Sequence, residues 1–174
     1  METYQALRIL EQDGQFVRRI ETLPLPELKA GEIQIQTAWS SVNYKDALSS
    51  AGNRGVTRQY PHTPGIDAAG TVTASMDDRF PVGTPVLVTG YDLGMNTDGG
   101  FGQVITVPAD WVVRLPQGLT VQDVMAIGTA GFTAAMAIAA LSDFLKPGDG
   151  PVLVTGATGG VGSMTIKLLS KIGY

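Results

Sequence analysis

Cysteine is absent from this 174-residue chain, and histidine occurs once, at His62. Without a thiol the chain forms no disulfide, builds no cysteine–zinc site and offers no cysteine nucleophile. His62 lies between Pro61 and Pro64, and we interpret it as a loop histidine outside any catalytic group. These absences exclude thiol chemistry and leave little material for a metal site.

Charge is scarce as well. Charged residues make up 16% of the chain and the net charge is −4, which gives no support for nucleic acid or an anionic membrane as a partner. The N-terminus lacks the basic-then-apolar pattern of a signal peptide, and Gly128, Gly131 and Thr133 interrupt the longest apolar stretch. We therefore expect a cytoplasmic protein that has no nucleic-acid or membrane partner.

The first two thirds of the chain contain short β-type runs separated by proline and glycine. In the third run Ile33 and Ile35 alternate with Gln34 and Gln36, as expected of a strand with one face in a core. This pattern predicts a compact barrel or sandwich. The expected strands are Tyr4–Leu10, Phe16–Thr22, Glu32–Ser41, Ala68–Ala74, Pro85–Thr89, Phe101–Pro108 and Val112–Leu115.

From Thr120 the apolar period becomes helical. Thr120 and Asp123 have the spacing of a capping box, and the apolar, alanine-rich segment up to Phe144 is expected to lie buried between layers. Gly128 and Gly131 each cost about 1 kcal/mol within a helix, so we expect two helices that meet near residues 129–131. The change of period predicts two domains, 1–119 and 120–174.

A glycine-rich segment, TGATGGVG, occupies residues 155–162. Val152–Val154 before it has the pattern of a short buried strand, and Gly159–Ile172 after it that of an amphipathic helix. Strand, glycine turn and helix together hold a pyrophosphate at a helix N-terminus. The spacing is neither a strict G-x-G-x-x-G nor a Walker loop, and a plain turn that packs the helix on the strand is the alternative.

Taken with the glycine segment, five further motifs run through nearly the whole chain in one order, and the chain resembles the medium-chain dehydrogenases/reductases. Within them it is similar to the zinc-free quinone-oxidoreductase group and its acrylyl-CoA reductase branch. The glycine segment alone also resembles the short-chain dehydrogenase fingerprint, but a β-rich domain precedes it and no Tyr-x-x-x-Lys pair follows. The five motifs are VNYKD (42–46), PGIDAAG (64–70), GGFG (99–102), VPA (107–109) and GFTA (131–134).

The resemblance implies a β-rich GroES-like barrel domain at residues 1–119. Residues 120–174 would then be connecting helices and the first β-α unit of an NAD(P)-binding Rossmann-type α/β domain, which we expect to be truncated. Zinc-dependent relatives place Cys where this chain has Asn43 and His where it has Ile66. Asparagine and isoleucine cannot replace those ligands, so zinc-assisted alcohol oxidation is excluded.

The activity that the resemblance implies is hydride transfer from NADPH to an activated C=C bond, such as that of acryloyl-CoA, or to a quinone. Asn43, Tyr44 and Asp46 are the expected catalytic residues, and Asp67 is expected to contact substrate or support the cleft. Alternatively, Asn43 and Asp46 only begin a helix over residues 44–50, and Tyr44 is packed.

The expected cofactor contacts fall in two groups besides Tyr44. Thr129 and Thr133 would face the nicotinamide, although a threonine that bonds a local carbonyl is the alternative. The acidic residue that would contact the cofactor ribose is expected beyond Tyr174, so the expectation of NADPH as the cofactor depends on the resemblance alone. The glycine-segment contacts are Gly156, Thr158, Gly159, Gly160, Val161 and Gly162.

A homodimer is expected at full length, and the alternative function is an inactive chain whose barrel is a folding or interaction module.

Overall fold

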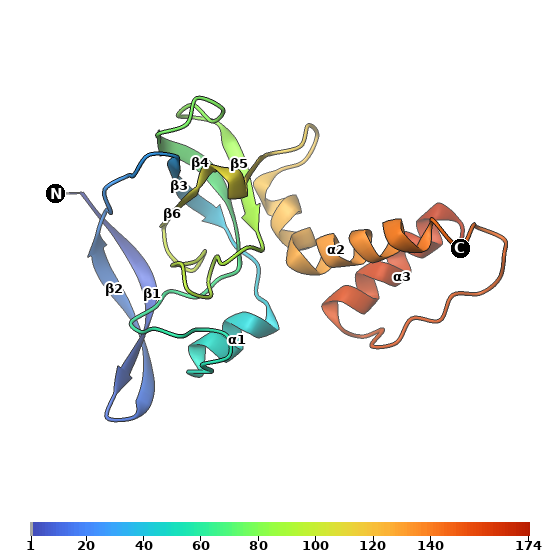
Figure 1. Ribbon diagram of the computed structural model, residues 1–174, viewed down its shortest axis with the longest axis horizontal. Helices are drawn as coiled ribbons and strands as arrows, with labels where there is room; N and C mark the ends of the chain where they lie inside the picture. Colours follow the sequence, from blue (N-terminus) through green and yellow to red (C-terminus); the bar gives the residue numbers. More distant parts are fainter. Residues whose placement is uncertain (1) are drawn as a thin grey trace. The chain divides into compact units, whose positions relative to one another are not determined.

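The computed structural model describes residues 2–174 (Figure 1). The chain forms two compact units, Met1–Ala126 and Ile127–Tyr174, which are described separately below. Among residues 2–174, the first unit contains the β-strands, a short helix and the start of a longer one, and the second unit is helical. The division at residue 119 expected from the sequence stays a prediction.

In the described part of the first unit, seven strands form a two-stranded hairpin and a five-stranded antiparallel sheet (Figure 1). Backbone bridges from Ala6 to Gly102 and from Ile9 to His62 join the hairpin to the rest of the unit. The expected β-rich GroES-like fold is confirmed. The hairpin is β1 (Thr3–Gln12) with β2 (Gln15–Pro24), and the sheet order is β6 (Val104–Pro108), β3 (Glu32–Trp39), β4 (Asp67–Ser75), β5 (Pro85–Thr89) and β7 (Val112–Arg114), which follows the 3-10 turn η1 (Ala109–Trp111).

The core of this unit lies on one face of the five-stranded sheet. Ile33 and Ile35 of β3 are completely buried, as their alternation predicted. Gln34 between them is also buried, and it is satisfied because its side-chain amide donates to the Pro26 carbonyl at 2.9 Å. The other core residues are Ala68, Val72, Phe80, Val86, Val88, Leu93, Ile105, Val107, Ala109 and Val112.

One helix, α1 (Tyr44–Ser50), follows β3 and has the bounds that the sequence predicted. Its first turn is closed by Asp46, whose Oδ2 accepts the backbone N–H of Asn43 at 2.7 Å. Because Asp46 also reaches the chain ahead of β4, this helix start is fixed to the sheet.

The helix α2 (Val121–Leu141) begins with the expected capping box: Asp123 Oδ2 accepts the Thr120 N–H at 2.8 Å, and the Asp123 N–H donates to Thr120 Oγ1 at 3.1 Å. Gly128 interrupts the helix with φ 51° and ψ −162°, a conformation that glycine adopts readily because it has no Cβ. Two helices therefore meet here as predicted, at Gly128, one residue before the expected segment 129–131.

The same helix is long and apolar enough to cross a membrane by length and composition, with a hydropathy of 1.9. The break at Gly128 divides it into residues 121–127 and 129–141, and each piece is shorter than the roughly 20 residues that a span requires. Val124 and Met125 also pack on Ala69 of the sheet within the first unit. The geometry is thus that of two short helices.

Two expectations for the second unit are wrong. The segment up to Phe144 is not buried on all sides: Phe132, Met136 and Phe144 are exposed, since no layer among residues 2–174 covers them. Residues 152–154 form no strand, and Leu153 is 89% exposed, because no neighbouring strand in this unit pairs with them. The helix that should follow is present as α3 (Gly160–Ile172).

Candidate active site

A cluster of polar side chains, a half-buried amide and two buried carboxylates, connects the start of α1 to the start of β4. Asn43 donates from Nδ2 to Asp67 Oδ2 at 2.9 Å. Asp67 is completely buried, and its other oxygen accepts a hydrogen bond from the Thr89 hydroxyl of β5. The structure therefore brings Asn43 and Asp67, which lie 24 residues apart, into direct contact.

Asp46 is the second carboxylate of this cluster and is 1% exposed. Besides the Asn43 N–H, it accepts the backbone N–H groups of Gly65 at 3.2 Å and Ile66 at 2.9 Å. Burial raises the pKa of Asp46, the bonds from Asn43 and Ile66 lower it in part, and the nearby charge of Asp67 raises it further. The residue joins α1 to the segment before β4.

Gly65 allows that segment to approach closely. Its φ is +110°, and a Cβ at this position would lie 2.7 Å from the backbone nitrogens of Gly100 and Phe101. Any other residue would push apart this segment and residues 99–101, whose N–H groups donate to the carbonyls of residues 63–65.

Tyr44 is 80% exposed, and its hydroxyl makes no hydrogen bond within residues 2–174. The alternative interpretation is half right, because Asn43 and Asp46 do begin a helix, but Tyr44 is not packed. Its hydroxyl is therefore available to a ligand. In sequence, Tyr44 follows Asn43, a member of the polar cluster.

A second polar cluster, centred on Arg8, was missed by the sequence reasoning. Arg8 Nη1 bonds Asp98 Oδ1 at 2.7 Å, and His62 Nδ1 lies 3.4 Å from the same oxygen. Arg8 and His62 are both buried, so His62 is a packed side chain at a backbone bridge. No sequence signal could show it, since Arg8 and Asp98 are 90 residues apart.

Burial raises the pKa of Asp98, but bonds from His62 and the Thr63 N–H together with the Arg8 charge outweigh it, so this pKa lies below its ordinary value. Asp98 therefore contributes stability above its unfolded pKa of about 4, and the contribution is lost as pH falls through the lowered value. Because the Asp98 side chain is 46% exposed, solvent screens these contacts, and Asp98→Asn should cost at most about 1 kcal/mol of unfolding free energy near neutral pH and progressively less in acid. Urea unfolding at neutral and acid pH measures this, and an equal cost at both would contradict it.

In the second unit the glycine segment forms an exposed turn before α3. Gly156 has φ +63°, and the Gly159 N–H donates to the Gly156 carbonyl at 3.0 Å. No side chain caps α3, and a Cβ on Gly162 would lie 2.2 Å from the Gly156 oxygen. The first N–H groups of this helix are therefore left without a side-chain cap, and that they hold a pyrophosphate stays a prediction.

The predicted threonines lie in the same unit. Thr133 Oγ1 donates to the Thr129 carbonyl at 2.7 Å, which is the alternative that the sequence left open. A Cβ on Gly160 would lie 3.1 Å from the Ala130 Cβ, so the glycine turn and this helix are close neighbours. Thr158 and Val161 are exposed beside them.

Asn43 and Ile66 lie near each other around Asp46, so the positions that zinc-dependent relatives use for ligands do meet here. The donors themselves are missing, because one position offers an amide that is bonded to Asp67 and the other an alkyl group. Across the described chain no group of three histidine, cysteine, aspartate or glutamate residues could hold a metal ion.

Comparison with known proteins agrees with this geometry. Residues 29–117 match the alcohol dehydrogenase GroES-like domain. The chain is 47% identical to the probable acrylyl-CoA reductase AcuI of Escherichia coli, over 98% of this chain and 53% of that protein. The yhdH oxidoreductase of Salmonella enterica, solved with NADP, has a TM-score of 0.93 at 48% identity, and the coverage is 98% of this chain and 53% of that one.

A third relative carries a different cofactor. The yhfP protein of Bacillus subtilis, solved with NAD bound, has a TM-score of 0.93 at 43% identity and covers 100% of this chain and 53% of its own. The chain thus spans about half the length of the curated relatives it matches. With the GroES-like match, the chain belongs to the alcohol dehydrogenase GroES-like family, among the zinc-free members of the medium-chain dehydrogenase/reductase superfamily.

Proposed function

We propose that this chain forms part of an NADPH-dependent, zinc-independent reductase of activated C=C bonds, with an enoyl thioester such as acryloyl-CoA or a quinone as acceptor. The observation that carries the proposal is the Asn43–Asp46–Asp67 cluster, in which both carboxylates are buried, next in sequence to the exposed Tyr44. The names of its relatives, acrylyl-CoA reductase and putative quinone oxidoreductase, support it.

Each residue of the cluster has a separate task in this proposal. Asp46 and Asp67 are held by backbone and side-chain donors, so they hold Asn43 and the start of α1 in one orientation. The Tyr44 hydroxyl donates a hydrogen bond to the carbonyl of the acceptor, which draws electron density from the reacting carbon. The carbonyl is already an electron-withdrawing group, so no metal is needed.

The glycine turn fits a dinucleotide, because its close Gly156–Gly162 packing leaves the first N–H groups of α3 uncovered. In the proposal Gly156 and residues 158–162 hold the pyrophosphate, and Thr129 and Thr133 face the nicotinamide. Bound NADPH supplies the hydride. NADPH is chosen over NADH because two solved relatives contain NADP or NADPH, although a third contains NAD. We further propose a cytoplasmic homodimer for the whole protein.

The 174 residues alone should show little or no NADPH-dependent turnover. A dinucleotide is enclosed where strand order reverses between two β-α units, and these residues hold one such helix without a paired strand. The test compares the isolated chain with a protein that continues it through a complete cofactor domain, with acryloyl-CoA and a quinone as acceptors. Turnover by the longer protein, without turnover by the isolated chain, supports the proposal. If neither protein binds NADPH or turns over, the chain is a folding or interaction module.

A further inference from the structure

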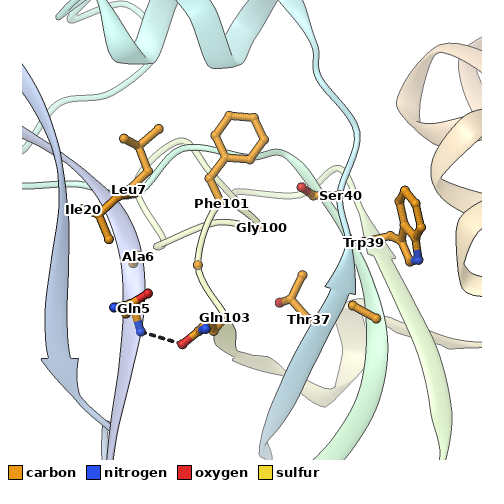
Figure 2. Close-up of a pocket in the computed structure, with 12 residues that line it drawn as sticks. Gln5, Ala6, Leu7, Ile20, Thr37, Trp39, Ser40, Gly100, Phe101 and Gln103 are labelled. Carbon is orange, nitrogen blue, oxygen red and sulfur yellow. Dashed lines mark hydrogen bonds between the residues drawn. The ribbon is translucent and has the colours of Figure 1, made fainter.

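A recess of about 350 Å³ opens between the β1–β2 hairpin and β3, within the first unit (Figure 2). Its floor is the segment 100–103. The Leu7 N–H donates to the Phe101 carbonyl, the Gln103 N–H to the Gln5 carbonyl and the Thr37 N–H to the Gln103 carbonyl, each at 2.9 Å. Because these bonds hold the floor in place, a ligand would not have to order it on binding.

The surface of this recess is neutral. Figure 2 shows Leu7 and Ile20 on the hairpin wall, Thr37 on β3, and the Phe101 ring between the two walls. In the described chain no lining residue carries a charge. Ile20 is 63% exposed although it is apolar, and the Thr37 hydroxyl is buried without a partner among residues 2–174. Alkyl, amide and hydroxyl groups together suit a neutral chain that alternates alkyl segments with amides.

The exposed side chain of Arg18 lies on the face of the hairpin that also carries Ile20. Leu7 pairs with Ile20 and Ile9 pairs with Arg18, so Arg18 and Ile20 project from one face, about 7 Å apart along the strand. Within the described chain Arg18 makes no hydrogen bond or ion pair, whereas Arg19 on the other face pairs with Glu21. Arg18 is therefore available to an anionic group at the hairpin end of the recess.

We propose that the recess binds the pantetheine arm of a coenzyme A thioester, with the pyrophosphate of the carrier at Arg18; this rests on the proposed function. The pantetheine arm itself is uncharged and carries two amides. In coenzyme A its far end is attached to the pyrophosphate, which is the anionic group. The opposite wall leads through Ser40 to Asn43, and a Cβ on the floor residue Gly100 would lie 2.3 Å from the Asp67 carbonyl. The acyl end thus points to the Asn43–Asp67 cluster.

The test uses the 174-residue chain and follows the backbone amide signals of residues 100–103 by NMR. Pantetheine should shift these signals saturably, with a Kd of about 1 mM or below for a ligand of its size. Coenzyme A should bind about three- to fivefold more tightly, and Arg18→Gln should remove that gain while leaving pantetheine binding unchanged. The absence of saturable shifts at residues 100–103 overturns the proposal, as does an unchanged coenzyme A gain in Arg18→Gln.

Two glutamate variants of β2 provide the control. Ile20→Glu places a charge in the recess and should abolish the binding of pantetheine, whereas Val17→Glu places the same charge on the opposite face and should not. Equal binding by both variants, or displacement of pantetheine by an uncharged naphthoquinone, contradicts the proposal. NADPH binding by the longer protein is measured separately. If it persists when the chain does not bind pantetheine, only this inference fails and the proposed reductase stands.

Discussion

Tyr44→Phe is expected to lower turnover by about 10²–10³ in a protein that carries this chain and a complete cofactor domain, which is the usual effect of removing one positioned donor where charge develops. The ring is retained, and the Tyr44 side chain is 80% exposed with no hydrogen bond from its hydroxyl among residues 2–174, so the melting temperature should not change. The measurements are kcat, KM for NADPH and the melting temperature of this variant.

Tyr91→Phe is the matched control, because Tyr91 is also exposed in the same unit, but its hydroxyl bonds the Asp110 carbonyl at 3.3 Å and its ring stacks on Trp111. It should retain wild-type turnover. If Tyr44→Phe also retains wild-type kinetics, Tyr44 has no part in the reaction. A large rise in KM for NADPH with unchanged kcat would assign the hydroxyl to cofactor binding alone.

Asp46→Ala should destabilise the first unit by about 3–5 kcal/mol. The substitution leaves the N–H groups of Asn43, Gly65 and Ile66 without their acceptor, and each buried orphan donor costs about 1–3 kcal/mol. This is a large part of the stability of an ordinary domain. Urea unfolding followed by fluorescence reports on this unit, since Trp39 and Trp111 both lie in it.

Asp123→Ala separates burial from helix capping. Asp123 holds the same position in α2 that Asp46 holds in α1, and it too accepts the N–H three residues before it, but it is exposed. Its loss should cost clearly less unfolding free energy than the loss of Asp46, because water can replace the lost acceptor at an exposed helix start. Equal costs for the two variants would show that Asp46 is an ordinary helix cap, and would remove the reason to place it in a preorganised site.

Local patterns predicted the fold because each acts within a few residues. The Asn43–Asp46 spacing placed α1 correctly, and the Ile33/Ile35 alternation identified the buried face of β3. The glycines of residues 155–162 indicated the turn before α3 and its uncapped N-terminus. In each case the neighbours that decide the conformation are close in the sequence.

Features that depend on distant partners could not be read in this way. The acceptor role of Asp46 depends on backbone groups 19 and 20 residues away, and Arg8 finds Asp98 across 90 residues. Residues 152–154 have strand propensity, yet without a paired neighbour they form no strand. Burial of the segment up to Phe144 likewise requires a covering layer, which residues 2–174 do not provide.

Transfer of deuterium from NADPH labelled at the nicotinamide C4 tests the central claim, metal-free hydride transfer by a site that includes this chain. The protein that continues the chain through a cofactor domain is first treated with a chelator, then supplied with the labelled cofactor and acryloyl-CoA. The account predicts that one deuterium appears at the β-carbon of the product, at a rate that the chelator does not change. Activity that is lost on chelation and restored by zinc would contradict it, since Asn43 and Ile66 offer that metal no ligand.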